Sequence, residues 1–175
     1  MSIVLEEPTA GTGAITLRLA EVGDGAALWR LVRDSRVLDL NSPYSYLLLC
    51  HKFGDTCLVA ESEGEVAGFV TAFRPPDAPD TVFVWQVGVA AQARGRGIAG
   101  RLLERLVELP ACRDARWLET TVTPDNAASE ALFASFARRL GAGHDVRPYF
   151  DRDHFPGDDH QPERLHRIGP LSPAS

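Results

Sequence analysis

A short polar loop with two glycines, Gln92-Ala93-Arg94-Gly95-Arg96-Gly97, interrupts the middle of this chain. An apolar run at 82–90 precedes the loop and predicts a β-strand, and the residues after the loop repeat their apolar side chains at helical spacing. A strand, a glycine turn and a helix N-terminus in succession direct several backbone N–H groups at one point, which suits a pyrophosphate. Because Gly95 and Gly97 have no Cβ atom, a phosphate can approach this backbone closely. The loop therefore predicts a phosphate-binding site.

The same loop fits the pattern Q/R-x-x-G-x-G/A and resembles the acyl-coenzyme A loop of the GNAT family of N-acetyltransferases. Two alternatives are a plain glycine turn and a Rossmann dinucleotide site, which needs Gly-x-Gly-x-x-Gly near the start of a βαβ unit. Gly100 fills the third glycine position, but at least three strand candidates precede the loop, which favours acyl-CoA. The resemblance implies acetyl-CoA as the cosubstrate. The cofactor contacts that it implies are Val87, Val89, Gln92, Ala93, Arg94, Gly95, Arg96, Gly97, Ile98, Asn126 and Phe133.

Length and composition limit the remaining classes of protein. The 175 residues suit one domain, with 1–14 as an N-terminal arm, 15–170 as the domain and 171–175 as a C-terminal tail. The net charge of −6, without a long basic run, argues against nucleic acid as a partner. No apolar stretch reaches the roughly 20 residues of a membrane span, and the start lacks the features of a signal peptide. The three cysteines show no C-x-x-C spacing, so we expect a reducing, cytoplasmic location.

The predicted elements alternate unevenly between strands and helices. Helices are expected after Asp24, through 47–50, at 95–109 and at 126–140, and a less regular polar tail is expected from Gly143. Strands are expected at 15–19, 56–60, 66–73, 82–90 and 117–122. This order is that of the GNAT acyl-CoA N-acyltransferase fold. It is an α/β fold whose mixed, mostly antiparallel central sheet is flanked by helices and splayed between the fourth and fifth strands.

Four further segments narrow the resemblance within this family. They are Asp39-Leu40-Asn41-Ser42-Pro43-Tyr44-Ser45-Tyr46, residues 79–87 (PDTVFVWQV), residues 123–129 (TPDNAAS) and residues 163–170 (ERLHRIGP). Together they resemble the L-2,4-diaminobutyrate acetyltransferases of the ectoine pathway, over about residues 15–170. The resemblance implies acetyl transfer to the 4-amino group of L-2,4-diaminobutyrate by direct attack in a ternary complex. It also implies N4-acetyl-L-2,4-diaminobutyrate as the product and a homodimer as the assembly.

Such a substrate carries two ammonium groups and one carboxylate, so its site needs anionic acceptors and a route for one proton. The candidate substrate contacts are Asp39, Asn41, Tyr44, Trp85, Glu119, His160 and Glu163. Glu119, acting through water, is the preferred base, and Tyr44 is a second candidate for a catalytic role. The alternatives stay open at this point: Asp39 could only shape a turn, Trp85 could lie in the core, and Glu119 could face solvent.

The cofactor side has its own alternatives. Arg94 and Arg96 could add charge at the pyrophosphate or could be solvated turn residues, and Asn126 could simply cap its helix. Many GNAT enzymes place a tyrosine after this Asn to protonate the leaving thiolate, and Phe133 stands at that position. The thiolate then leaves unprotonated, through water, or with help from another residue such as Tyr44.

Two further alternatives concern metals and function. The spacing of His154, His160 and His166 suggests a metal site, but no Cys or paired carboxylate completes a usual ligand set, so no metal is expected. The competing functions are an acetyltransferase for another small amine and a non-catalytic acyl-CoA sensor. Protein acetylation is disfavoured, because the proline-rich loop at 75–79 and the polar tail are expected to close the acceptor side.

Overall fold

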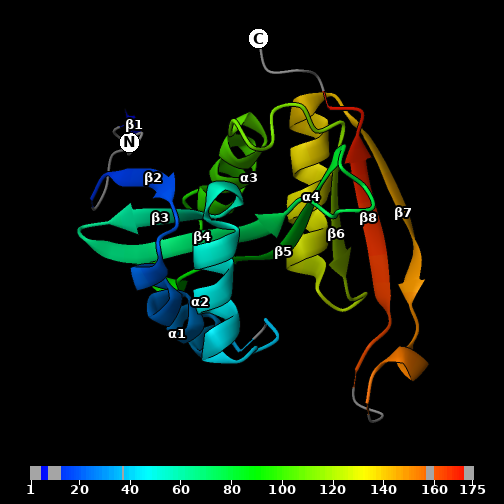
Figure 1. The fold of residues 1–175 in the computed structure, drawn as a ribbon, viewed down its shortest axis with the longest axis horizontal. Helices are drawn as coiled ribbons and strands as arrows, with labels where there is room; N and C mark the ends of the chain where they lie inside the picture. Colours follow the sequence, from blue (N-terminus) through cyan, green and yellow to red (C-terminus); the bar gives the residue numbers. More distant parts are fainter. Residues whose placement is uncertain (1–4, 8–12, 37, 157–159, 172–175) are drawn as a thin grey trace.

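The computed structural model describes residues 5–7, 13–36, 38–156 and 160–171. One eight-stranded sheet runs through it in the order β1-β2-β3-β4-β5-β6-β8-β7 (Figure 1). Neighbouring strands are antiparallel except β5 and β6. The strands are β1 (Leu5–Glu7), β2 (Ile15–Leu19), β3 (Leu58–Ser62), β4 (Glu65–Phe73), β5 (Thr81–Val89), β6 (Trp117–Val122), β7 (Gly143–Phe150) and β8 (Glu163–Gly169). This is the mixed, mostly antiparallel sheet that the sequence predicted.

Four α-helices cover the two faces of this sheet. One apolar cluster joins α3 and α4 to one face, and a second joins α1 and α2 to the other, where Phe69 and Val59 point. Figure 1 shows α1 and α2 running beside one another over β4 and β5. The α-helices are α1 (Gly25–Ser35), α2 (Pro43–Lys52), α3 (Ile98–Glu108) and α4 (Ala127–Leu140). Short 3-10 turns occur at Val22–Asp24, Gly54–Thr56, Ala91–Ala93 and Arg152–His154. None of the helices in the described residues is long and apolar enough to cross a membrane.

The sheet opens between its only parallel pair of strands. β5 and β6 pair only from Thr81↔Trp117 to Phe83↔Glu119, although β5 continues to Val89 and β6 to Val122. Backbone groups on the facing edges beyond Phe83 therefore have no partner in the β5–β6 ladder. The predicted splay between the 82–90 and 117–122 strands is confirmed.

A β-bulge bends β5 at the start of this opening. Ala72 pairs with Val84 and Thr71 with Gln86, so Trp85 is an extra residue in the ladder with β4. Val84 lies in the core under α3 and α4, whereas Gln86 reaches Tyr46 of α2 on the opposite face. The bulge leaves Trp85 41% exposed, so it is not the core residue that was the alternative.

Three expectations about the chain's ends and loops are corrected. Leu5–Glu7, in the segment expected to be a loose arm, pairs with β2. The tail from Gly143 forms a long hairpin, β7 and β8, that extends the sheet beyond β6. The sequence hid β7 because most of its residues are exposed on both faces and show no apolar alternation. The proline-rich loop at 75–79 lies at the closed end of β5, and no residue of it lines the cavity described below.

Candidate active site

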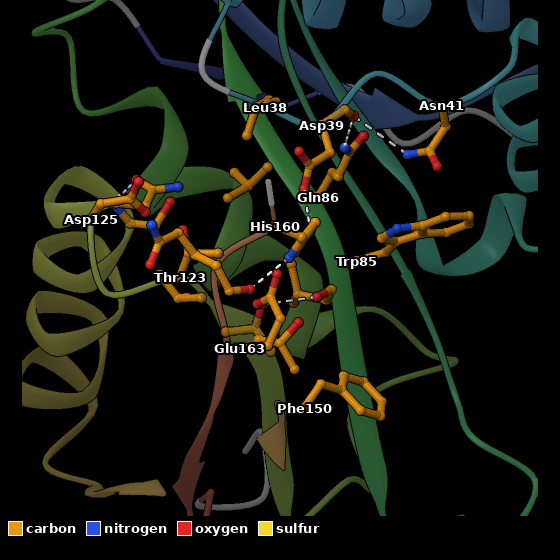
Figure 2. A pocket seen from close by; sticks show the side chains of 18 of the residues that line it. Leu38, Asp39, Asn41, Trp85, Gln86, Thr123, Asp125, Phe150, His160 and Glu163 are labelled. Atoms are coloured by element: carbon orange, nitrogen blue, oxygen red, sulfur yellow. Dashed lines mark hydrogen bonds and ion pairs between the residues drawn. The ribbon is translucent and has the colours of Figure 1, made fainter. Parts of the chain in front are cut away.

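A cavity of about 870 Å³ occupies the opening between β5 and β6. Its walls come from β5, β6, the start of α4, the end of the β7–β8 hairpin and residues 38–41, which we call the acceptor loop. Figure 2 shows Asp39 above His160 and Glu163, with Trp85 and Asn41 to one side and Thr123 and Asp125 to the other. Residues from four stretches that lie far apart in the sequence, 36–41, 84–87, 120–133 and 150–163, therefore meet at the splay.

Three acid–base side chains converge at the centre of this cavity. One ligand atom each of Asp39, His160 and Glu163 lies within 4.8 Å of the other two. The Asp39 side chain is 81% exposed, and its Oδ2 lies 3.7 Å from Nε2 of His160. Burial raises the pKa of Glu163, and the Thr121 hydroxyl and His160 offset part of that rise. The cluster can receive a cationic group and hold a proton close to it.

His160 is fixed on two sides. Its ring stacks on Phe155 with centroids 3.7 Å apart and planes 9° from parallel. Its Nδ1 lies 2.6 Å from the Gln161 carbonyl oxygen, which can only accept a hydrogen bond. Nδ1 is therefore the donor in this contact, and Nε2 pairs with the Asp39 carboxylate, which only accepts, when it too carries a proton.

Sequence reasoning missed a buried amide that joins the acceptor loop to the core. The Tyr46 hydroxyl donates to Oε1 of Gln86 at 2.9 Å, and Nε2 of Gln86 donates to the Asp39 carbonyl at 2.7 Å. Both residues stand in segments that narrowed the family resemblance, which was the available signal.

Two expected residues lie outside the cavity lining. Glu119 belongs to the last β5–β6 pair, accepts a hydrogen bond from Arg167 at 3.0 Å, and has a side chain that is 14% exposed. It is thus neither a solvent-facing residue nor placed as a contact in this cavity. Tyr44 lies in the first turn of α2, is 69% exposed and does not line the cavity. The other expected acceptor residues, Asp39, Asn41, Trp85, His160 and Glu163, all line the cavity.

A second hollow of about 260 Å³ lies beside the first, against the glycine loop. Gly95 and Gly97 adopt φ values of 77° and 70°, a left-handed conformation that glycine adopts at low cost. No atom lies within 4 Å of where their Cβ atoms would be, so the space above them is open. Of the expected cofactor contacts, Val89, Ala93, Arg94, Gly95, Gly97 and Ile98 line this hollow.

The remaining cofactor predictions divide between the two hollows and other places. Val87, Asn126 and Phe133 line the larger cavity. Gln92 is exposed and Arg96 donates to the Gly13 carbonyl at 2.8 Å, so neither lines the second hollow. Arg139 of α4 does line it, a residue that the sequence did not single out. Asn126 caps α4 by accepting from the Ser129 N–H at 3.1 Å, while its position at the cavity wall leaves a cofactor contact available.

Comparison with known proteins adds independent evidence at this point. The family model for the acetyltransferase (GNAT) family matches residues 26–137. The chain belongs to the GNAT family. It is 49% identical to the L-2,4-diaminobutyric acid acetyltransferase of Shouchella clausii over 160 residues, which are 91% of this chain and 89% of that protein. It is also 49% identical to the one from Streptomyces coelicolor, over 94% of this chain and 98% of that one.

Solved structures of the GNAT family agree with this placement. The diaminobutyrate acetyltransferase of Paenibacillus lautus, in complex with its substrate L-2,4-diaminobutyric acid and coenzyme A, superposes with a TM-score of 0.87. It is 45% identical and the match covers 90% of this chain and 96% of that one. An N-acetyltransferase from Staphylococcus aureus, 23% identical, superposes with a TM-score of 0.68 over 90% of this chain and 99% of that one, which shows the fold alone.

Two further predictions concern the position where many GNAT enzymes have a tyrosine and the histidines at 154, 160 and 166. Phe133 is 2% exposed and supplies no hydroxyl to the cavity. The three histidines whose spacing suggested a metal site do not meet: His154 is exposed, His160 lines the cavity, and His166 is buried beside His144. Among the described residues, the Asp39, His160 and Glu163 cluster brings possible metal ligands together, and the same oxygens suit an ammonium group.

Proposed function

We propose that this chain transfers the acetyl group of acetyl-CoA to the 4-amino group of L-2,4-diaminobutyrate, giving N4-acetyl-L-2,4-diaminobutyrate for the ectoine pathway. The observation that carries the proposal is the Asp39, His160 and Glu163 cluster in the cavity that adjoins the glycine-loop hollow. A relative solved with this substrate and coenzyme A has the same fold at 45% identity. Acetyl-CoA occupies the hollow and extends along β5 to the opening between β5 and β6. The diamino acid occupies the cavity in that opening, next to the acetyl group.

The charges of the cavity match those of the diamino acid. Asp39 and Glu163 accept hydrogen bonds from the two ammonium groups. The substrate carboxylate pairs with Arg36, the one arginine that lines the cavity among the described residues. Asn41 and Trp85 close the side of the cavity and exclude water from the reacting amine.

Glu163 removes the proton from the 4-ammonium group. Burial raises its pKa, which makes its carboxylate a better proton acceptor than an exposed glutamate. The base expected from sequence, Glu119, is already paired with Arg167 and lies outside the lining. The base therefore moves from β6 to the first residue of β8.

The freed amine attacks the thioester directly, without an acyl-enzyme. Backbone N–H groups near Val89, where β5 has left β6, polarise the thioester carbonyl. The pantetheine arm pairs with the open edge of β5, and amides from Ala93 to Ile98 hold the pyrophosphate. Because Phe133 has no hydroxyl, the thiolate leaves unprotonated or takes its proton from water. Correct placement of amine and thioester supplies much of the rate.

The remaining features of the proposal concern the whole chain. Residues 15–170 act as one catalytic domain in the cytoplasm, no metal takes part, and two copies form a homodimer. Light scattering coupled to size-exclusion chromatography tests the dimer. A mass of one chain at micromolar concentration, with full activity, would contradict it.

The decisive experiment measures thiol release from acetyl-CoA with L-2,4-diaminobutyrate, ornithine, lysine and spermidine offered in parallel. We expect rapid turnover with diaminobutyrate and a product acetylated at the 4-amino group by mass spectrometry. Equal or faster turnover with another amine would indicate a different acetyltransferase. Acetyl-CoA binding without turnover of any amine would indicate a sensor.

A further inference from the structure

The buried side-chain amide of Gln86 connects β5 to both α2 and the acceptor loop through hydrogen bonds. It lies on β5, accepts from Tyr46 of α2 and donates to the main chain of the acceptor loop. The Asp39 carbonyl can only accept, so the Gln86 NH₂ group must face it and the Tyr46 hydroxyl must donate to Oε1. The orientation of the amide is therefore fixed by its partners.

The Asp39 carboxylate depends on this contact because little else holds it. The Asp39 side chain is 81% exposed, so its direction follows from its backbone rather than from packing. The only other described hydrogen bond to the Asp39 carbonyl comes from Nδ2 of Asn41 at 3.5 Å, which is long. Gln86, 9% exposed and anchored at the bulge of β5, supplies the short bond at 2.7 Å.

We propose that Gln86, held by Tyr46, is a positioning residue that sets the place of the Asp39 carboxylate for the amine substrate. Tyr46 and Gln86 form a relay from the core of α1 and α2 to the acceptor loop. The identity of the amine rests on the proposed function, whereas the relay itself does not. Gln86 acts through Asp39, because both ends of its amide are engaged with protein groups.

Steady-state kinetics on substituted proteins tests this relay. Gln86→Met keeps the length of the side chain and removes both hydrogen bonds, so we expect the KM for diaminobutyrate to rise about tenfold. Tyr46→Phe removes the supporting bond to Gln86 and the interaction of the Tyr46 hydroxyl with Asn41, so the expected rise is about threefold. The KM for acetyl-CoA should not change in either variant, and the rise in the double variant should be smaller than the product of the two single effects.

Two comparisons separate positioning from other roles. Thr56→Val removes another buried hydrogen bond on β4, from the Thr56 hydroxyl to the Ala72 carbonyl at 2.6 Å, and should leave the KM for the amine unchanged. In an Asp39→Ala background, Gln86→Met should add nothing further. A tenfold rise that persists in that background would overturn the relay, because Gln86 would then contact the substrate directly.

Hydrogen exchange tests the relay without any substrate. Backbone amides of residues 38–42 should exchange faster in Gln86→Met than in the unaltered protein or in Thr56→Val. Unchanged exchange there would overturn the relay. If the unaltered protein turns over no diaminobutyrate, the proposed function fails while this measurement still decides the relay.

Discussion

The coenzyme hollow and the acceptor cavity lie along the same strand, β5, but are assembled differently. The hollow is formed mainly by one continuous segment, residues 93–100, together with one side of α4. The cavity takes side chains from the acceptor loop, β5, β6, α4 and the β7–β8 hairpin. One site is therefore local in sequence and depends on backbone shape, whereas the other depends on long-range packing that brings side chains together.

The charged side chains of the hollow and of the cavity are opposite in sign to the ligands proposed for them. Arg94 and Arg139 line the hollow, where a pyrophosphate is proposed to bind. Asp39, Asp125 and Glu163 line the cavity, with Arg36 as its arginine. Substitutions on either side should therefore affect one substrate and spare the other.

The largest effect is expected at Glu163. Glu163→Gln keeps the size of the side chain but cannot take the proton, so kcat should fall at least about 100-fold. The dissociation constant for acetyl-CoA, measured by calorimetry, should not change. Glu119→Gln serves as the matched control and should keep most of the activity. A large loss of kcat in Glu119→Gln with little loss in Glu163→Gln would assign the base to Glu119. The ion pair between Glu119 and Arg167 would then have to open during the reaction.

A smaller loss is expected on the coenzyme side. Gly97→Val places a branched side chain at φ 70° and into the open space of the hollow, so the KM for acetyl-CoA should rise about 30-fold. Gly64→Val imposes a comparable backbone strain at φ 81°, in the turn between β3 and β4, and Gly64 lines neither the hollow nor the cavity. It should lower the melting temperature to a similar degree but leave both KM values unchanged. A similar rise of the acetyl-CoA KM in Gly64→Val would mean that strain alone explains the loss.

Arg36 gives a sharper test of the cavity. 1,3-Diaminopropane is diaminobutyrate without its carboxylate, so it cannot pair with Arg36. In Arg36→Met, the preference for diaminobutyrate over 1,3-diaminopropane, as a ratio of kcat/KM values, should fall about tenfold. An unchanged ratio would place the carboxylate elsewhere in the cavity.

The smallest effect concerns the pH dependence of stability, through two histidines of the β7–β8 hairpin that borders the cavity. His144 and His166 lie with Nε2 and Nδ1 3.0 Å apart on the β7–β8 hairpin, and burial lowers both pKa values from 6.5. The unfolded chain therefore binds more protons than the folded protein as the pH falls below about 6.5, and the free energy of unfolding decreases there. The limiting slope is about 1.4 kcal/mol per pH unit for each imidazole that stays neutral when folded.

Urea unfolding at pH 7.5, 6.5 and 5.5 measures this dependence. Replacing both histidines with Gln should flatten it, whereas His51→Gln, at an exposed position on α2, should not. An unchanged slope in the double variant would assign the pH dependence to other groups.

The coenzyme side could be predicted from local sequence, whereas the acceptor side could not, for a physical reason. The glycine loop and the start of α3 carry their geometry in consecutive residues, and six of the expected contacts line the hollow. The bond from Arg96 to the Gly13 carbonyl could not be predicted, because nothing local shows that Gly13 lies within reach of its guanidinium. Arg139 was missed because it comes from another helix.

The acceptor residues were predicted through the family resemblance, and strand register separates those that line the cavity from those that do not. Glu119 and Thr121 lie two residues apart on the same face of β6, yet only Thr121 lies beyond the last β5–β6 pair and lines the cavity. The point where two strands separate depends on tertiary structure, so strand periodicity could not distinguish these positions. The β7–β8 hairpin was missed for a similar reason, since β7 is held by pairing with β8 rather than by an apolar face.

The bulge at Trp85 has a consequence for how the cavity relates to the sheet. Val84 and Gln86 face opposite sides, as consecutive residues do in a regular strand, and Trp85 stands between them as an addition. A chain shortened by Trp85 alone would keep both neighbours on their present faces and restore an unbroken ladder with β4. The pairing of β4 and β5 is therefore complete without this tryptophan. Trp85 is an inserted residue that contributes to the cavity wall and leaves its two neighbours on their faces of the sheet.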